Sequence, residues 1–265
     1  MRPPIPAKFF QIDAFTTARF AGNPAAVMLL DAFAPDAVLQ ALAAENNLAE
    51  TAFLVQDRGD YRLRWFTPAL EVPLCGHATL ASAAVVMERL EPGREVVVFH
   101  TASGPLTVAR SGGGYVMNFP SRPCTAVEPP ADLARALGAE SQEVVWDGFN
   151  LLVRLETPDV VRGLAPDLAA VAKLPCAGLI VTASDGGAFD FVSRYFAPAK
   201  GIPEDPVTGG AHCALAPYWA ERLGKSEFRA FQASQRGGEI VCRVRGERVE
   251  LEGSCVFYLE GEATF

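Results

Sequence analysis

The sequence lacks the short motifs that mark the commonest metal and cofactor sites. It has only three histidines in 265 residues, no HExxH pattern, and no CxxC pair among its six cysteines. Zinc sites usually need such closely spaced ligands. Neither GxGxxG nor GxxxxGKS/T occurs, so the corresponding dinucleotide and ATP sites are not indicated. We therefore expect no metal and no cofactor.

Long apolar runs and dense basic clusters are also missing. No hydrophobic stretch approaches the about 20 residues that span a bilayer, and residues 1–8 lack the apolar core of a signal peptide. The formal net charge is −8 and the basic residues are scattered. This balance argues against nucleic acid or an anionic membrane as a partner. These features predict a cytoplasmic protein whose cysteines are thiols.

What the sequence does contain is an internal repeat. The pattern Arg-aromatic-Phe-x-Pro occurs at 64–68 and again 130 residues later at 194–198. Each copy leads into small and apolar residues, at 78–90 and 211–223, which is typical of a buried helix. A repeat of this size implies two similar domains. The Pro-rich stretch that follows residue 120 marks the boundary, so we expect domains at 1–120 and 121–265.

Strand patterns surround both expected helices. In the first half they cover 9–15, 24–30, 51–55 and 61–66, and in the second half they include 178–182 and 190–196. Their spacing does not fit a regular βαβ parallel sheet. The sequence therefore predicts an α+β fold in which each half is a mixed sheet rolled around one hydrophobic helix.

Three segments carry polar groups at points where apolar ones would be expected. Glu50 begins an apolar strand, and a carboxylate near a core normally has a partner or a task. Cys75, Gly76 and His77 lead into the first buried helix, where free backbone amides can bind an anion. Taken singly, Glu50 could face solvent, and the second segment could be a helix start with a buried thiol.

The third segment begins the second buried helix. It contains Asp205, Thr208, Gly209 and Gly210. Alone it could be an ordinary acidic helix N-terminus. The repeat, however, places two helix N-termini at equivalent points of facing domains. Each could then hold part of one anionic ligand.

Five segments, at 20–24, 47–53, 66–68, 71–79 and 204–209, resemble the phenazine-biosynthesis PhzF-like isomerase family in sequence, order and spacing. The resemblance covers nearly the whole chain. It implies a diaminopimelate-epimerase-like fold: two similar β-roll domains, each wrapped around a central helix, with the active site in the interdomain cleft. It also implies a cofactor-independent homodimer that acts on a small anionic metabolite by acid–base catalysis.

The resemblance implies a role for individual residues as well. Glu50 would move a proton between carbons of the substrate, assisted by His77 and Asp205. The implied substrate-binding positions are Asn23, Cys75, Gly76, Thr208, Gly209 and Gly210. Ala49 and Gly210 stand where the family often has Ser, so we expect a small carboxylate-bearing metabolite and no particular phenazine precursor.

Two other functions remain open from the sequence. In a two-base racemase, Cys75 would be one of two opposed thiols, and Cys213 would be the only nearby candidate for the second. In a metabolite-binding or interaction module, the same residues would bind without turnover. The joint presence of Glu50, His77 and Asp205 favours catalysis, because binding alone needs no base.

Overall fold

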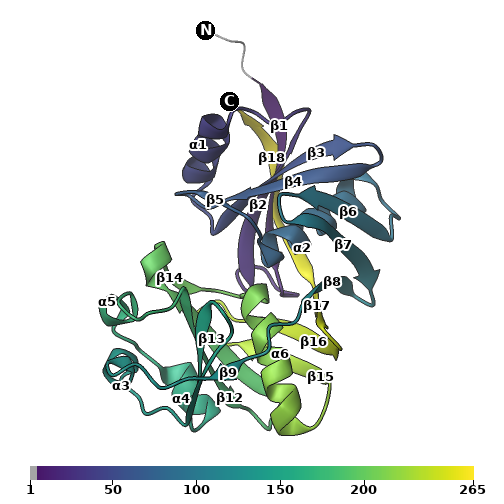
Figure 1. The fold of residues 1–265 in the computed structure, drawn as a ribbon. Coiled ribbons are helices and arrows are strands. Elements are labelled where there is room, and N and C mark those ends of the chain that lie inside the picture. The colour runs from purple at the N-terminus through teal and green to yellow at the C-terminus, as the bar shows by residue number, and fades with distance from the viewer. Residues whose placement is uncertain (1–4) are drawn as a thin grey trace. The chain divides into compact units, whose positions relative to one another are not determined.

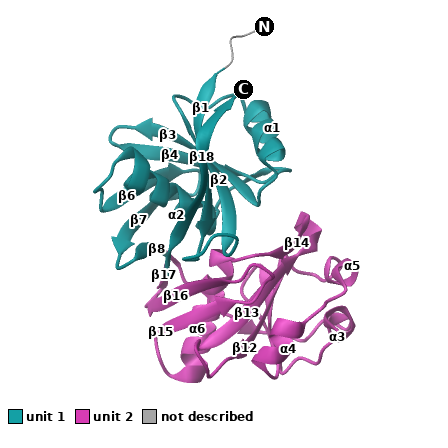
Figure 2. Cartoon of the chain, turned by 180° about the vertical axis from the view of Figure 1, so that it is seen from behind, with its two compact units in different colours: residues 1–118, 252–265 teal, residues 119–251 magenta. Residues whose placement is uncertain are grey.

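The computed structural model of the chain describes residues 5–265 (Figure 1). Residues 1–4, part of the segment in which we expect no signal peptide, lie outside the described residues. The chain forms two compact units: residues 1–118 with 252–265 (unit 1), and residues 119–251 (unit 2; Figure 2). Among the described helices, none combines the length and apolarity needed to cross a membrane.

Unit 1 is built on a mixed sheet. Its strands are β1 (Pro6–Ala14), β2 (Asn23–Leu30), β3 (Glu50–Asp57), β4 (Asp60–Phe66), β5 (Glu71–Val72), β6 (Val96–Thr101), β7 (Gly104–Ser111), β8 (Gly114–Pro120) and β18 (Cys255–Thr264). β1 lies between β18 and β2 and pairs antiparallel with both. The sheet continues with β3, which pairs parallel with β2, and β4, which pairs antiparallel with β3. β6 then pairs parallel with β4, and β7 pairs antiparallel with β6. The short arm β5 pairs with the end of β4.

The central helix of unit 1 is α2 (Gly76–Val85), which continues as a π-helical turn, η1 (Val86–Leu90). Every residue from 77 to 85 is buried, and the helix packs against β1, β2, β3 and β18. Its hydroxyls bond within the helix: Thr79 Oγ1 donates to the Cys75 carbonyl at 2.5 Å, and Ser82 Oγ to the Ala78 carbonyl at 2.7 Å. An apolar helix can therefore be buried on every side without leaving these groups unsatisfied.

A second helix, α1 (Asp36–Asn46), lies against the sheet separately from α2. Leu39 and Ala43 pack there with Met28, Phe53 and Phe66 in a separate hydrophobic cluster. Asn47 adopts the left-handed conformation that ends α1, and its N–H bonds to the Ala43 carbonyl at 3.2 Å. The chain then turns directly into β3.

Unit 2 repeats this plan. Its strands are β9 (Thr125–Ala126), β10 (Glu143–Trp146), β11 (Asn150–Arg154), β12 (Gly178–Ser184), β13 (Phe191–Ala197), β14 (Ile202–Asp205), β15 (Glu227–Gln232), β16 (Gly238–Arg245) and β17 (Arg248–Gly253). β10 lies between β9 and β11 and pairs antiparallel with both. The sheet continues with β12, which pairs parallel with β11, and β13, which pairs antiparallel with β12. β15 then pairs parallel with β13, and β16 pairs antiparallel with β15. The short arm β14 pairs with the end of β13. The order of strand directions is that of unit 1.

The central helix of unit 2 is α6 (Gly209–Leu223), mostly buried and packed against β15 and β16. Gly224 ends it in the left-handed conformation, as its position in the sequence predicts. Short helices α3 (Leu133–Leu137), α4 (Pro158–Gly163) and α5 (Leu168–Val171) pack with β10–β13 in a second cluster. A 3₁₀ turn, η2 (Pro198–Lys200), precedes β14. We did not predict α4, although Thr157 caps its N-terminus by accepting the Val160 N–H.

The chain passes from unit 1 to unit 2 near the end of β8 and returns to unit 1 near the end of β17. β9 follows β8 of unit 1 along the chain but pairs with β10, and β18 follows β17 but pairs with β1. We expected the C-terminal strand in the second domain, and the structure places it in unit 1. Its backbone pairs with β1 from Pro6 to Ala14, which ties it there. A mixed sheet with a buried central helix in each half is confirmed.

Candidate active site

Glu50 lies at the first position of β3, opposite Ala25 of β2. The local fold fixes it there, because Asn46 at the end of α1 donates a hydrogen bond to Thr51 Oγ1 at 3.1 Å. Only 12% of the Glu50 side chain is exposed. Such a buried carboxylate needs a partner.

That partner is His77, the second residue of α2. Its Nε2 lies 3.1 Å from Glu50 Oε2, and 5% of its side chain is exposed. The other ring nitrogen, Nδ1, lies 3.1 Å from Asn23 Nδ2 and 3.5 Å from Cys75 Sγ. Three elements of unit 1, namely β2, β3 and the start of α2, therefore bring four of the predicted site residues together.

The surroundings of His77 favour its charged form. Burial by itself lowers the pKa of His77, but the neighbouring Cys75 and Glu50 outweigh that effect and hold the pKa well above 6.5. Burial raises the pKa of the Cys75 thiol above 9.0, and the Glu50 charge adds to this. The site therefore places a histidine that favours its charged form beside the Glu50 side chain and beside a thiol that favours its neutral form. Asn23 can meet Nδ1 in either protonation state, because an amide presents a donor or an acceptor when it turns over.

Glu50, Cys75 and His77 are also the one group among the described residues whose ligand atoms lie close enough to hold a metal ion. The imidazole, however, lies between the other two groups: Nδ1 faces the thiol and Nε2 faces the carboxylate. One ion binds one ring nitrogen, so it would have to replace one of these contacts. The arrangement suits the movement of protons along the ring better than metal binding.

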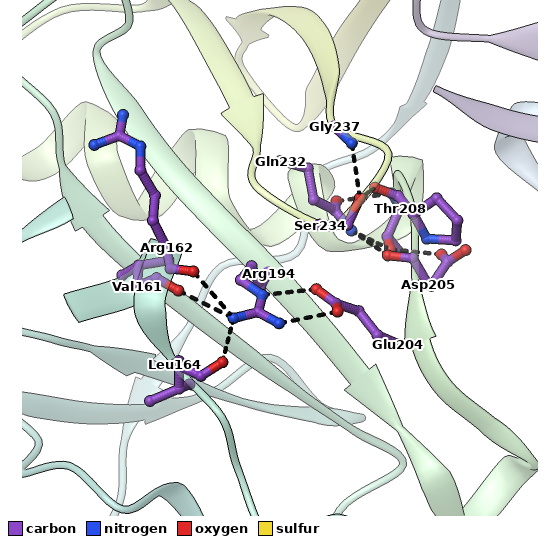
Figure 3. Close-up of polar contacts among 11 residues, drawn as sticks. Val161, Arg162, Leu164, Arg194, Glu204, Asp205, Thr208, Gln232, Ser234 and Gly237 are labelled. Atoms are coloured by element: carbon purple, nitrogen blue, oxygen red, sulfur yellow. Dashed lines mark hydrogen bonds and ion pairs between the residues drawn. The ribbon is translucent and has the colours of Figure 1, made fainter. Parts of the chain in front are cut away.

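In unit 2, the predicted residues lie at the end of β14 and the start of α6. Figure 3 shows Asp205 and Thr208 there. Asp205 is the last residue of β14, and its Oδ2 accepts a hydrogen bond from Thr208 Oγ1 at 2.5 Å. The Thr208 N–H donates to Gln232 Oε1 at 2.8 Å. Both donors of Thr208 are therefore used inside unit 2. The structure shows no hydrogen bond from the Gly209 and Gly210 amides to another described residue, and these amides lie at the positive end of the α6 dipole.

Gln232 is a residue of this region that sequence reasoning missed. It is fully buried at the end of β15, where its amide reaches both Asp205 and Thr208. A signal was present: Phe228, Ala230 and Gln232 occupy the buried face of an alternating strand, and a polar residue on such a face needs hydrogen-bond partners.

The two helix starts are equivalent in structure but carry different chemistry. Cys75 and Thr208 are the N-cap residues of α2 and α6. Counting from these caps, His77 corresponds to Gly210. A pair of opposed thiols is therefore absent from these two helix starts. Cys213 lies one turn into α6, where burial raises its pKa to about 12 and its thiol faces the Gly209 carbonyl at 3.6 Å.

The strand that carries Glu50, β3, also differs in chemistry from its counterpart in unit 2, β12. Thr51 pairs with Phe66 in unit 1, and Leu179 pairs with Phe196 in unit 2, so Glu50 corresponds to Gly178. A Cβ atom at Gly178 would overlap Tyr195 Oη. Unit 2 thus has no side chain where unit 1 has its buried carboxylate, and a tyrosine fills the space.

Comparisons with known proteins agree with this architecture. A family model described as phenazine biosynthesis-like protein, PhzC-PhzF, matches residues 12–261. The chain is 50% identical over 252 residues to an uncharacterized isomerase of Pseudomonas aeruginosa, with 95% of this chain and 96% of that protein covered. A crystal structure of a PhzF-family phenazine biosynthesis protein from Enterococcus faecalis matches with a TM-score of 0.94 at 41% identity, over 98% of this chain and 99% of that one.

A more distant similarity concerns the fold alone. A hydroxyproline epimerase from Agrobacterium vitis matches with a TM-score of 0.60 at 11% identity, over 98% of this chain and 93% of that one. The resemblance read from the sequence is confirmed by these matches. The chain belongs to the phenazine biosynthesis-like, PhzC-PhzF, family of proteins.

Proposed function

We propose that the protein is a cofactor-independent isomerase that moves a proton between two carbons of a small carboxylate-bearing metabolite. The observation that carries the proposal is the buried contact of 3.1 Å between Glu50 Oε2 and His77 Nε2. A largely buried carboxylate held by a histidine in this way is suited to general acid–base catalysis. Family membership and the names of the relatives as isomerases support the same class of reaction.

The proposed steps need no co-reactant. Glu50 Oε2 is held by His77, so the other carboxylate oxygen takes the proton. The C–H bond breaks, an O–H bond forms, and the electron pair moves into the adjacent unsaturated system of the substrate. Glu50 then returns the proton to a different carbon, and its carboxylate is restored. Nothing is oxidised or reduced overall.

Charge that develops on the substrate would be stabilised by backbone amides. In unit 1 these are the amides at the start of α2, around Gly76. In unit 2, the proposal gives the Gly209 and Gly210 amides at the start of α6 an anion-binding role. It gives Asp205 an assisting role.

The differences between the units support one proton carrier over two. A two-base racemase needs acid–base groups of similar kind on opposite sides of the reacting carbon. Thr208 stands at the position of Cys75, Gly210 at that of His77, and Gly178 at that of Glu50. Cys213 is buried against the Gly209 carbonyl with a strongly raised pKa. These replacements disfavour the racemase.

The test is isotope exchange. The protein is incubated in D₂O with a panel of carboxylate metabolites that carry an acidic C–H bond, and each compound is followed by NMR and mass spectrometry. We expect at least one compound to be isomerised, with deuterium entering unless the site shields the proton from solvent. Glu50→Gln should slow this by about 10²–10⁴-fold, and Glu45→Gln, an exposed neighbour on α1, should not. Normal isomerisation by Glu50→Gln would end the proposal.

A further inference from the structure

A chain of hydrogen bonds connects Gln232 to the Asp205 carboxylate (Figure 3). Gln232 Nε2 lies 3.1 Å from Thr208 Oγ1 and 2.7 Å from the Asp205 carbonyl, and Gln232 Oε1 lies 2.8 Å from the Thr208 nitrogen. Thr208 Oγ1 in turn lies 2.5 Å from Asp205 Oδ2. Gln232 is fully buried.

The backbone fixes the orientation of the Gln232 amide, and with it the direction of the Gln232 hydrogen bonds. The Thr208 N–H can only donate, so the Gln232 atom facing it must be the oxygen. The opposite atom is then the amide nitrogen, and it faces the Asp205 carbonyl, which can only accept. Thr208 Oγ1 accepts from this nitrogen. Its single proton is therefore free to point at Asp205 Oδ2.

The hydrogen bonds that run from Gln232 through Thr208 affect the Asp205 carboxylate. A hydroxyl that already accepts a hydrogen bond becomes a better donor. A bond donated to a carboxylate stabilises its ionised form and fixes its orientation. The arrangement therefore suits a carboxylate that must stay charged and in one place, at the start of α6.

The backbone around Asp205 is anchored on both sides as well. Before it, Glu204 binds the Arg194 guanidinium through both carboxylate oxygens, at 2.7 and 2.9 Å. After it, the Pro206 carbonyl accepts a hydrogen bond from Ser234 Oγ at 2.8 Å. These anchors fix the path of the backbone, whereas Thr208 Oγ1 contacts the Asp205 carboxylate itself.

We propose that Gln232 and Thr208 are positioning residues, which form a one-directional hydrogen-bond relay that holds the Asp205 carboxylate ionised and oriented for the reaction. The importance of the relay for turnover rests on the proposed function, in which Asp205 assists Glu50. Thr208 then positions Asp205 and does not bind the substrate, because its N–H and its hydroxyl both donate to other residues. In this proposal, the backbone amides of Gly209 and Gly210 bind the anionic group of the substrate.

The test follows the titration of the Asp205 side chain by ¹³C NMR, with the signal identified by its loss in Asp205→Asn. In Thr208→Val the hydroxyl is replaced by a methyl group of similar size, so we expect the titration midpoint to move to higher pH. Gln232→Met removes the first donor and should move it in the same direction by a smaller amount. Thr208→Ser keeps the hydroxyl and should restore the wild-type midpoint.

Ser234→Ala is the matched control, because it removes a hydrogen bond from the same turn without touching the carboxylate. Its midpoint should stay at the wild-type pH. An unchanged midpoint in folded Thr208→Val overturns the relay, and so does an equal shift in Ser234→Ala. If Thr208→Val does not fold, Gln232→Met decides by the same criterion. The titration needs no substrate, so its outcome is independent of whether Glu50→Gln abolishes isomerisation.

Discussion

Arg64 and Arg194 occupy equivalent positions in the two units and make the same contacts. Arg64 binds both carboxylate oxygens of Glu71 at 2.7 Å, and Arg194 binds both of Glu204 at 2.7 and 2.9 Å. Each guanidinium also lies over the phenylalanine two residues further along its strand, 5.1 and 4.9 Å from the ring centre. The repeated motif in the sequence is therefore a structural clamp, which holds the arm leading to each central helix.

The clamps should differ in their contribution to stability. Arg194 is 12% exposed and also donates to backbone carbonyls, including that of Leu164, whereas Arg64 is 23% exposed. Removal of a buried partner leaves a charge unpaired, so Arg194→Met should lower the free energy of unfolding by about 3 kcal/mol. Arg64→Met should cost about 1 kcal/mol. Urea unfolding of both variants checks this, and equal losses would contradict it.

The sequence was sufficient to predict the parts of the fold that depend on local pattern. The segments at 78–90 and 211–223 are apolar on nearly every side, and they form the central helices apart from small shifts at their ends. The local sequence pattern does not show which distant strands pair with one another. The C-terminal strand has the same pattern whether it pairs in one unit or the other, so its place beside β1 could not be predicted.

In the candidate site, too, the residues within sequence motifs could be predicted, but contacts between distant segments could not. Glu50 and His77 could be predicted because the family motifs include them, and the structure brings them together. Gln232 lies more than 20 residues after Asp205 and Thr208, and its role depends on where β15 ends beside α6. A buried polar residue on a strand can be noticed in the sequence, but its partners cannot be named.

The thiol of Cys75 should be unreactive at neutral pH. Burial and the nearby Glu50 charge raise its pKa above 9.0, so the reactive thiolate forms only in alkaline solution. Labelling by iodoacetamide should therefore be slow at pH 7 and accelerate above pH 9. Cys75→Ser should keep most turnover on the compound identified by isotope exchange. Complete loss in a folded variant that still binds that compound would favour the racemase.

The His77–Glu50 pair should make stability depend on pH in one direction. The folded-state pKa of His77 is raised above 6.5, so the protonated ring stabilises the native state. This contribution is complete below about pH 6.5 and is lost as the pH rises through the folded-state value. The melting temperature of wild type minus that of His77→Gln should therefore be largest near pH 6 and shrink toward pH 9. A difference that grows over this range would contradict the assignment.

Gly210 should accept a side chain, although Gly178 should not. A Cβ at Gly210 meets nothing within 4 Å, and its φ is not in the left-handed region. Gly210→Ser should change the free energy of unfolding by less than about 1 kcal/mol. A Cβ at Gly178 overlaps Tyr195 Oη, so Gly178→Ala should cost about 1–3 kcal/mol. Similar thermal unfolding of the two variants would show that the difference between the sites has been misjudged.

The relative effects of changes at Glu50 and Asp205 test whether Asp205 acts in the reaction proposed for Glu50. Glu50→Gln removes the proposed proton carrier and should lower turnover by about 10²–10⁴-fold, whereas Asp205→Asn should cost less, because it removes only assistance. If both act on one reacting molecule, the double variant should be little worse than Glu50→Gln, since a positioned substrate is of no use without a base. Asp205→Asn should change the melting temperature little, whereas Glu50→Gln leaves the buried His77 without its carboxylate partner and should lower it near pH 6. Rates are measured on the compound found by isotope exchange. Fully additive losses would mean that Asp205 acts independently of Glu50, and a larger loss for Asp205→Asn than for Glu50→Gln would transfer the role of base to unit 2.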